Sequence, residues 1–105
     1  MIVILRACRK EIKTLPEEIR GDLADALARL DAGLVLSMPL SRPMPDIGRG
    51  VHELRLKDRS GTYRVVIALV QRDAVHVLHA FKKTTQSTSA RNLELARKRL
   101  KEVRS

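Results

Sequence analysis

The sequence predicts an α+β domain in which an antiparallel sheet carries helices on one face and is followed by a C-terminal helix. An apolar stripe at helical spacing fills the first half of the chain, and strand-like runs joined by tight turns fill the second half. The chain has 105 residues, of which 44% are hydrophobic and 31% charged. We therefore expect a single domain over residues 1–105 with one modest core.

The first half of the chain predicts a strand and a long helix. Residues 2–5 are β-branched and aliphatic, as in a strand, and residues 6–13 fit either a short helix or a turn. Thr14 and Glu17 have the spacing of a capping box, so the long helix is expected to begin there, and Gly33 is expected to end it. Its apolar stripe has spacings of three and four and consists of Leu15, Ile19, Leu23, Leu27, Leu30 and Leu34.

A connector rich in proline and glycine separates this helix from the predicted sheet. Residues 35–50 fit neither a helix nor an internal strand. The pattern that follows predicts an antiparallel meander, with strands at 51–57, 62–70 and 74–81 and turns at 60–61 and 72–73. Together with the strand predicted at residues 2–5, these strands would form one sheet, with one strand before the long helix in the sequence and three after it.

A basic amphipathic helix is predicted at the end of the chain, with Ser89 as its N-terminal cap. Its narrow apolar stripe consists of Leu93, Ala96, Leu100 and Val103. Basic side chains are expected to occupy its remaining surface, namely Arg91, Arg97, Lys98, Arg99, Lys101 and Arg104.

The charge of the chain points to an anionic partner. Lysine and arginine number 21 against 12 acidic residues, which gives a net charge of +9. A domain this basic is expected to bind a polyanion or an acidic protein. Aromatic residues are limited to Tyr63 and Phe81, which excludes an extended platform for stacking nucleic-acid bases.

Several other classes of protein are disfavoured. Cys8 is the only cysteine, so an internal disulfide is impossible, and no histidine or other base motif accompanies it as in a cysteine nucleophile. The sequence has no phosphate-binding loop, dinucleotide turn or metal-ligand spacing, so we expect no metal and no cofactor. The apolar runs are too short for a membrane span or a secretory signal, and we expect a cytoplasmic protein that has no membrane partner.

Arg64 interrupts the most apolar predicted strand, where a charge is costly unless it meets solvent or a partner. Alternation places Arg64 opposite the expected core residues of its strand, which are Tyr63, Val65, Ile67 and Leu69. Arg55 on the neighbouring strand projects the same way, and two guanidinium groups on one face would form a forked site for phosphate oxygens. The alternative is an ion pair between Glu53 and one of these arginines, without a ligand.

The end of the last predicted strand gathers a histidine, an aromatic ring and two lysines, at His79, Phe81, Lys82 and Lys83. Histidine moves protons near neutral pH, and lysines contact phosphate. Such side chains can cleave RNA without a metal, because RNA supplies its own 2′-hydroxyl nucleophile. The alternative is a structural histidine beside a solvated basic loop, and we expect His52 and His76 to be structural.

Three short motifs occur in a characteristic order: Glu-Leu-Arg at 53–55, Gly-Thr-Tyr-Arg-Val at 61–65 and His-Ala-Phe-Lys-Lys-Thr-Thr-Gln at 79–86. With the Leu-Pro-Glu-Glu segment at 15–18, they resemble the HigB-like branch of the RelE/ParE toxin superfamily, over about residues 14–104. The chain departs from the family pattern at two positions. Thr84 stands where a lysine is usual, and Ser89 replaces the usual proline.

This resemblance implies a RelE-like fold and a toxin of a type II toxin–antitoxin pair that cleaves mRNA on the translating ribosome. Its implied partners are mRNA, the ribosome and an antitoxin, often a helix-turn-helix protein, which binds the toxin as a hetero-oligomer. The family's pattern implies catalytic roles for Arg55, Arg64, Lys83 and His79. The implied RNA contacts are Lys57, Tyr63, Phe81, Lys82 and Gln86.

Two other functions fit the same sequence. One is a toxin of the superfamily that cleaves no RNA and inhibits DNA gyrase, and the other is a non-toxic phage or regulatory RNA-binding protein. The first would stop replication while mRNA stays intact, and the second would leave growth unchanged on induction.

Overall fold

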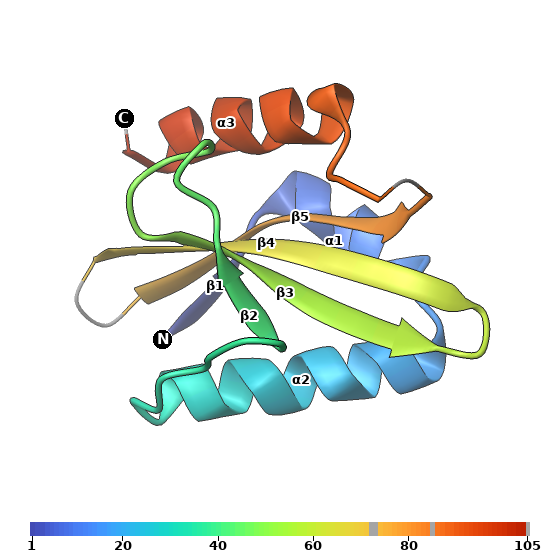
Figure 1. Cartoon of the computed structure of the whole chain (residues 1–105). Coiled ribbons are helices and arrows are strands. Elements are labelled where there is room, and N and C mark those ends of the chain that lie inside the picture. Colours follow the sequence, from blue (N-terminus) through green and yellow to red (C-terminus); the bar gives the residue numbers. More distant parts are fainter. Residues whose placement is uncertain (72–73, 85, 105) are drawn as a thin grey trace.

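A computed structural model of the chain describes residues 1–71, 74–84 and 86–104. The described residues form a five-stranded sheet in the order β1-β5-β4-β3-β2, with helices on both sides (Figure 1). The elements in chain order are β1 (Ile2–Ile4), α1 (Arg6–Lys13), α2 (Glu17–Asp31), β2 (Ser41–Pro43), β3 (Val51–Asp58), β4 (Gly61–Gln71), β5 (Ala74–Lys83) and α3 (Ala90–Arg104).

The predicted meander is confirmed, because β3 pairs with β4 and β4 with β5, both antiparallel. A tight turn joins β3 and β4 as predicted, but it lies at residues 59–60, one position earlier than expected, and Gly61 begins β4. Asp58 accepts a hydrogen bond from the Ser60 N–H at 2.8 Å in this turn. The predicted turn at residues 72–73 lies outside the described residues.

The two outer strands differ from the expectation. β1 joins the sheet in parallel with β5, so the sheet is not wholly antiparallel. β2 arises from the connector at residues 35–50 and pairs with β3 as an edge strand. An edge position tolerates Pro43, because that residue needs no backbone N–H on the solvent side.

Helices cover the two faces of the sheet, with α2 on one face and α3 on the other, while α1 lies beside β5 (Figure 1). The side chains of β4 show that both faces of the sheet are buried. Val65 and Ile67 belong to the core under α1 and α2, whereas Val66 and Ala68 belong to the core under α3. A nearly continuous apolar strand is typical of a sheet covered on both sides, so the expectation that helices pack on one face does not hold for α3, which covers the other face.

The start of α2 corrects the predicted capping box. α1 forms over residues 6–13, and the Thr14 hydroxyl donates to the Glu11 carbonyl at 2.6 Å as α1 ends. α2 then begins at Glu17 without a side-chain cap. Thr14 is therefore committed to the end of one helix and does not begin the next.

The end of α2 is as expected, because Gly33 has a positive φ of 88° just after the helix. Leu34 lies beyond this turn and is exposed, so it is not part of the apolar stripe. Leu69 in β4 is also exposed, contrary to its predicted place in the core. β3 begins at Val51, which pairs with Ala68, so the pairing of β3 with β4 ends before Leu69.

α3 confirms most of its prediction. The Asn92 N–H donates to the Ser89 hydroxyl at 3.3 Å, and Ala96 and Leu100 are buried against the sheet. Arg99 is the exception, because it is buried and donates to the Leu78 carbonyl at 2.9 Å. Within the described residues, no helix has the length and apolar character needed to cross a bilayer.

Candidate functional site

The sheet pairing brings basic side chains together on the face that α3 covers only in part. Arg55 lies directly opposite Arg64, Arg42 lies opposite Glu53, and Lys83 lies opposite Thr62. Paired residues point to the same side of a sheet, as do residues two apart along a strand. We call the surface formed by Arg42, Arg55, Arg64 and Lys83 the basic face.

Arg64 is the most buried member of the basic face, with 4% of its surface exposed. Its Nε lies 3.2 Å from Glu53 Oε1, as an ion-pair contact rather than a directed hydrogen bond, and its Nη1 donates to the Tyr63 carbonyl at 3.2 Å. Burial and the neighbouring Arg55 lower the pKa of Arg64, and Glu53 opposes this shift. The cross-strand ion pair considered from the sequence is thus present for Arg64.

Arg55 differs from Arg64, because it is only half-buried and forms no salt bridge among the residues that the structure describes. The buried carboxylate of Glu53 therefore offsets only part of the positive charge around it. Burying Arg64 while leaving Arg55 half-exposed gives this face one fixed guanidinium and one that is open to a ligand.

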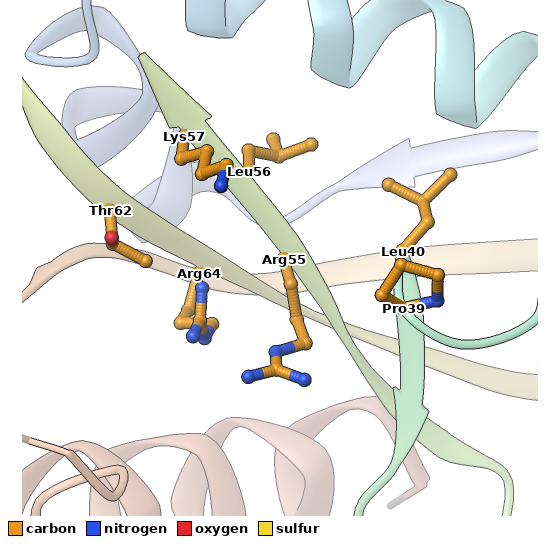
Figure 2. A pocket seen from close by; sticks show the side chains of 7 residues that line it. All are labelled: Pro39, Leu40, Arg55, Leu56, Lys57, Thr62 and Arg64. Atoms are coloured by element: carbon orange, nitrogen blue, oxygen red, sulfur yellow. The ribbon is translucent and has the colours of Figure 1, made fainter. Parts of the chain in front are cut away.

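Two adjoining hollows lie on either side of Arg64. The first has a volume of about 480 Å³ and is lined by Pro39, Leu40, Arg55, Leu56, Lys57, Thr62 and Arg64 (Figure 2). The second has a volume of about 310 Å³ and is lined by Thr62, Arg64, Lys83, Thr84 and Gln86. Because Thr62 and Arg64 line both, an extended anionic ligand can contact Arg55 and Lys83 at once.

Lys83 is half-buried at the second hollow. Partial burial, followed by the charge of Arg64, lowers the pKa of its ammonium group. A lysine with a lowered pKa gives up its proton more readily than a solvated one. This side chain can therefore contact phosphate and transfer a proton.

Tyr63 and Lys82 lie on the opposite face from Arg64. Tyr63 is buried in the core under α2, and its hydroxyl contacts the Ser60 hydroxyl at 2.5 Å. Lys82 lies opposite Tyr63 in the sheet, with its Nζ 6.0 Å from the centre of the tyrosine ring. Neither residue lines the two hollows, because alternation along the strands turns them away from the basic face.

His79 and Phe81 lie on the same face as Arg64, with Phe81 directly opposite Arg64, but neither residue lines the two hollows. Their rings stack with centroids 4.9 Å apart. His79 is buried, its Nδ1 is 2.9 Å from Glu11 Oε1, and its Nε2 is 2.7 Å from Asn92 Oδ1. Both ring nitrogens thus have partners within the protein, and this geometry supports the structural interpretation of His79.

Glu11 is the centre of this buried network. Its Oε1 accepts hydrogen bonds from the Ala80 N–H at 3.1 Å and from Arg99 Nη1 at 2.7 Å, in addition to its contact with His79. Burial alone would raise the pKa of Glu11, but the bonds from His79 and Arg99 outweigh it and lower the pKa to about 2. The network joins α1, β5 and α3 beside the basic face.

The remaining candidate residues have structural environments. Cys8 is buried, and burial together with Glu11 raises the pKa of its thiol to about 12, which opposes a nucleophilic role. His52 Nδ1 lies 3.5 Å from the Ser41 hydroxyl. Across the described part of the chain, no three histidine, cysteine or acidic side chains gather as metal ligands would.

Sequence reasoning missed several residues at the site. Pro39 and Leu40 line the first hollow from the connector, where no local pattern indicates a site. Thr62 lines both hollows, and its position opposite Lys83 could have been found from the predicted meander. Thr88 donates to Glu53 Oε2 at 2.7 Å, a contact between residues 35 apart in the sequence.

Comparison with solved structures supports the fold. A mutant of the E. coli toxin RelE in the free state shares 16% identity with a TM-score of 0.64, over 98% of this chain and 96% of that one. The isolated E. coli RelE toxin gives 21% identity and a TM-score of 0.55, over 98% and 97% of the two chains. A chain of the intact E. coli RelBE toxin–antitoxin complex gives 22% identity and a TM-score of 0.56, over 81% and 98%. The RelE-like fold expected from the motifs is therefore confirmed.

Comparison of sequences gives the family. No curated protein sequence matches the chain significantly. The family model described as phage-derived protein Gp49-like (DUF891) matches residues 10–101, which include the basic face and the network around Glu11. The chain therefore belongs to the phage-derived Gp49-like family.

Proposed function

We propose that this protein is the toxin of a toxin–antitoxin pair and acts as an endoribonuclease on mRNA at the translating ribosome. The observation that carries this proposal is the position of Arg64, which is held between two hollows with Arg55 on one side and Lys83 on the other. The RelE-like fold supports the same class of function. The motif resemblance adds the ribosome as the place of action.

The arrangement suits phosphate binding followed by cleavage without a metal. Arg64 and Arg55 would bind the non-bridging oxygens of the scissile phosphate and stabilise the charge that develops there. The neighbouring 2′-hydroxyl attacks phosphorus and loses its proton to water in the open hollow. The bond to the 5′-oxygen breaks as Lys83 protonates that oxygen, which leaves a 2′,3′-cyclic phosphate and a free 5′-hydroxyl.

The walls of the hollows suit the rest of a nucleotide. Pro39 and Leu40 give the first hollow an apolar side, against which a ribose or a base can pack (Figure 2). Lys57 adds a further charge for the backbone, and Gln86 lines the second hollow with an amide. DNA would bind in the same way but would not be cleaved, because it lacks the 2′-hydroxyl.

An antitoxin is the proposed protein partner. One similar structure is a toxin–antitoxin complex, and this chain carries a net charge of +9. An acidic segment laid over the basic face would neutralise Arg55 and block both hollows. The expected complex is therefore a hetero-oligomer in which the RNA site is covered.

The proposal is tested with purified protein, translating ribosomes and a defined mRNA. The wild-type protein should cleave the mRNA, Arg64→Ala should not, and Lys98→Ala should cleave as the wild type does. Lys98 is the matched control, because it is an exposed basic residue of α3 that lines neither hollow. Intact mRNA with blocked DNA synthesis would instead support a gyrase inhibitor, and unchanged growth on induction would support a non-toxic RNA-binding protein.

A further inference from the structure

We infer that Glu53 is a positioning residue that fixes the orientation of Arg64 and links it to Thr88, in the segment before α3. The inference rests on the proposed function, because it assigns Glu53 a role in the reaction at the basic face. It goes beyond that function by giving an acidic residue a part in a site that binds an anion.

The environment of Glu53 is unusual for a carboxylate. Only 2% of its surface is exposed, and it lies in β3 between Arg42 on β2 and Val66 on β4. A buried carboxylate is costly unless it is paired and hydrogen-bonded. Among the described residues, each oxygen has one partner: Oε1 lies 3.2 Å from Arg64 Nε, and Oε2 accepts a hydrogen bond from the Thr88 hydroxyl at 2.7 Å.

The contact at Nε determines which part of the Arg64 guanidinium meets a ligand. A guanidinium group has five N–H donors in a rigid plane. Glu53 attracts the Nε side, and Nη1 uses one N–H on the Tyr63 carbonyl. One hydrogen bond at Nη1 and one ion-pair contact at Nε thereby orient the plane, and the remaining donors of the terminal nitrogens are left for a phosphate in the hollows that Arg64 lines.

Thr88 extends this link toward the second hollow. The residue lies between Gln86, which lines that hollow, and Ser89, which caps α3. Its hydrogen bond to Glu53 therefore fixes the start of α3 relative to Arg64. A single carboxylate thus aligns side chains from β4 and from the segment before α3.

Because Glu53 is charged, its positioning role can be distinguished from a purely structural role. Replacing Glu53 with glutamine removes a negative charge from the midst of Arg42, Arg55, Arg64 and Lys83, so electrostatic attraction for RNA should rise. The same change releases Arg64 from its fixed orientation, so the rate of cleavage should fall. Binding and cleavage are expected to change in opposite directions, whereas simple unfolding would lower both.

The experiment compares the wild type with Glu53→Gln in two assays. Affinity is measured with an RNA oligonucleotide that carries a 2′-deoxy substitution at the cleaved position, so that it binds but cannot react. Cleavage is measured on translating ribosomes at saturating protein. We expect Glu53→Gln to bind as tightly as the wild type or more tightly, and to cleave about 10²-fold more slowly. Cleavage equal to that of the wild type, or a loss of binding that matches the loss of cleavage, would overturn the inference.

A second pair of variants guards against misfolding of Glu53→Gln. Thr88→Val removes the hydroxyl that donates to Glu53 but keeps the shape and charge, and Thr88→Ser keeps the hydroxyl. We expect Thr88→Val to cleave several-fold more slowly than Thr88→Ser while both bind the deoxy oligonucleotide equally. Equal cleavage by the two variants would show that the link through Thr88 has no role.

Failure of the proposed function is distinguishable from failure of this inference. If the wild type does not cleave RNA, the proposed function fails, and the orientation of Arg64 is then followed by the exchange of its Nε–H with solvent in an NMR experiment. Glu53→Gln should accelerate this exchange at least about tenfold because it removes the charge that holds the group. Unchanged exchange would contradict the positioning role whatever the enzyme does.

Discussion

Arg55 and Arg64 lie directly opposite one another on β3 and β4, with both guanidinium groups on the same face of the sheet. Like charges in this position destabilise a sheet. Glu53 offsets the charge of Arg64, but Arg55 lacks a salt bridge within the described residues. The arrangement costs stability in the free protein, and a phosphate bound between the arginines would reverse that cost.

The first prediction concerns this cost. Arg55→Gln should raise the free energy of unfolding by about 0.2–1 kcal/mol, because it removes one of two like charges placed opposite each other. The same variant should bind RNA more weakly and reduce the slope of log affinity against log salt by about 0.7, the value for one contact to a single strand. Urea unfolding and RNA binding over a range of salt concentrations measure the two effects.

Lys98→Gln is the matched control for Arg55→Gln, because it removes one exposed positive charge from α3, away from the hollows. It should leave the free energy of unfolding and the salt slope near their wild-type values. A variant of Arg55 that is less stable than the wild type, with unchanged affinity for RNA, would contradict a binding role for this residue.

The second prediction concerns Lys83 and the pH dependence of cleavage. Partial burial and the charge of Arg64 lower the pKa of Lys83 below its usual value, so the ammonium form is lost at a lower pH than for a solvated lysine. As the proposed proton donor, it should give a rate that falls as pH rises through this pKa. Lys83→Arg keeps the charge for binding but donates poorly, so cleavage should drop about 10²-fold or more with binding retained.

The control for this prediction is Lys82→Arg, because Lys82 lies beside Tyr63 on the other face of the sheet. Its rate and its pH profile should match those of the wild type. If Lys83→Arg keeps the full rate and the same alkaline limb, proton transfer at the site belongs to another group.

The third prediction concerns the stability of the network around Glu11. The folded-state pKa of Glu11 is lowered from 4.5 to about 2, so its contribution is fully present above about pH 4.5 and is lost as the pH falls toward 2. Glu11→Gln should therefore be less stable than the wild type at neutral pH, by roughly 3 kcal/mol. The difference between the two proteins should disappear near pH 2, which urea unfolding at a series of pH values measures.

A fourth prediction tests the core between the sheet and α2. Leu54 is fully buried in β3, so Leu54→Ala should lower the free energy of unfolding by about 2–5 kcal/mol through lost burial and a residual cavity. Leu34 is exposed after the end of α2, so Leu34→Ala should change the free energy of unfolding by less than about 0.5 kcal/mol. Similar losses of unfolding free energy for both variants in denaturant titrations would contradict the burial of Leu54 in the core and the exposure of Leu34.

The elements that local patterns determine were predictable from the sequence. β4 shows this most clearly, because alternation alone predicted Arg64 on the face opposite Tyr63. The exact partner of Arg64 was not predictable, because the turn lies at 59–60 rather than 60–61, and this shift places Arg55 directly opposite Arg64. The cap at Ser89 and the glycine stop at Gly33 were also local signals, and both are confirmed.

The features that depend on tertiary contacts were not predictable in this way. β2 is a Ser-Arg-Pro segment with little strand propensity, and it forms a strand because β3 provides an edge. The helical pattern predicted Arg99 on the surface of α3, because its partner, Glu11, is 88 positions away in the chain and gives no local signal. The placement of Lys82 and His79 outside the hollows follows likewise from sheet register and from contacts with α1 and α3.

The most direct test of the central claim is the rate at which Arg64→Lys cleaves an mRNA on translating ribosomes, compared with the wild type. Lysine keeps the positive charge but loses the planar fork that Glu53 and the Tyr63 carbonyl hold in place. The wild type should produce ends with a 2′,3′-cyclic phosphate, and Arg64→Lys should do so about 10²-fold more slowly. Equal rates for the two proteins would contradict the claim that a fixed guanidinium at this position holds the reacting phosphate.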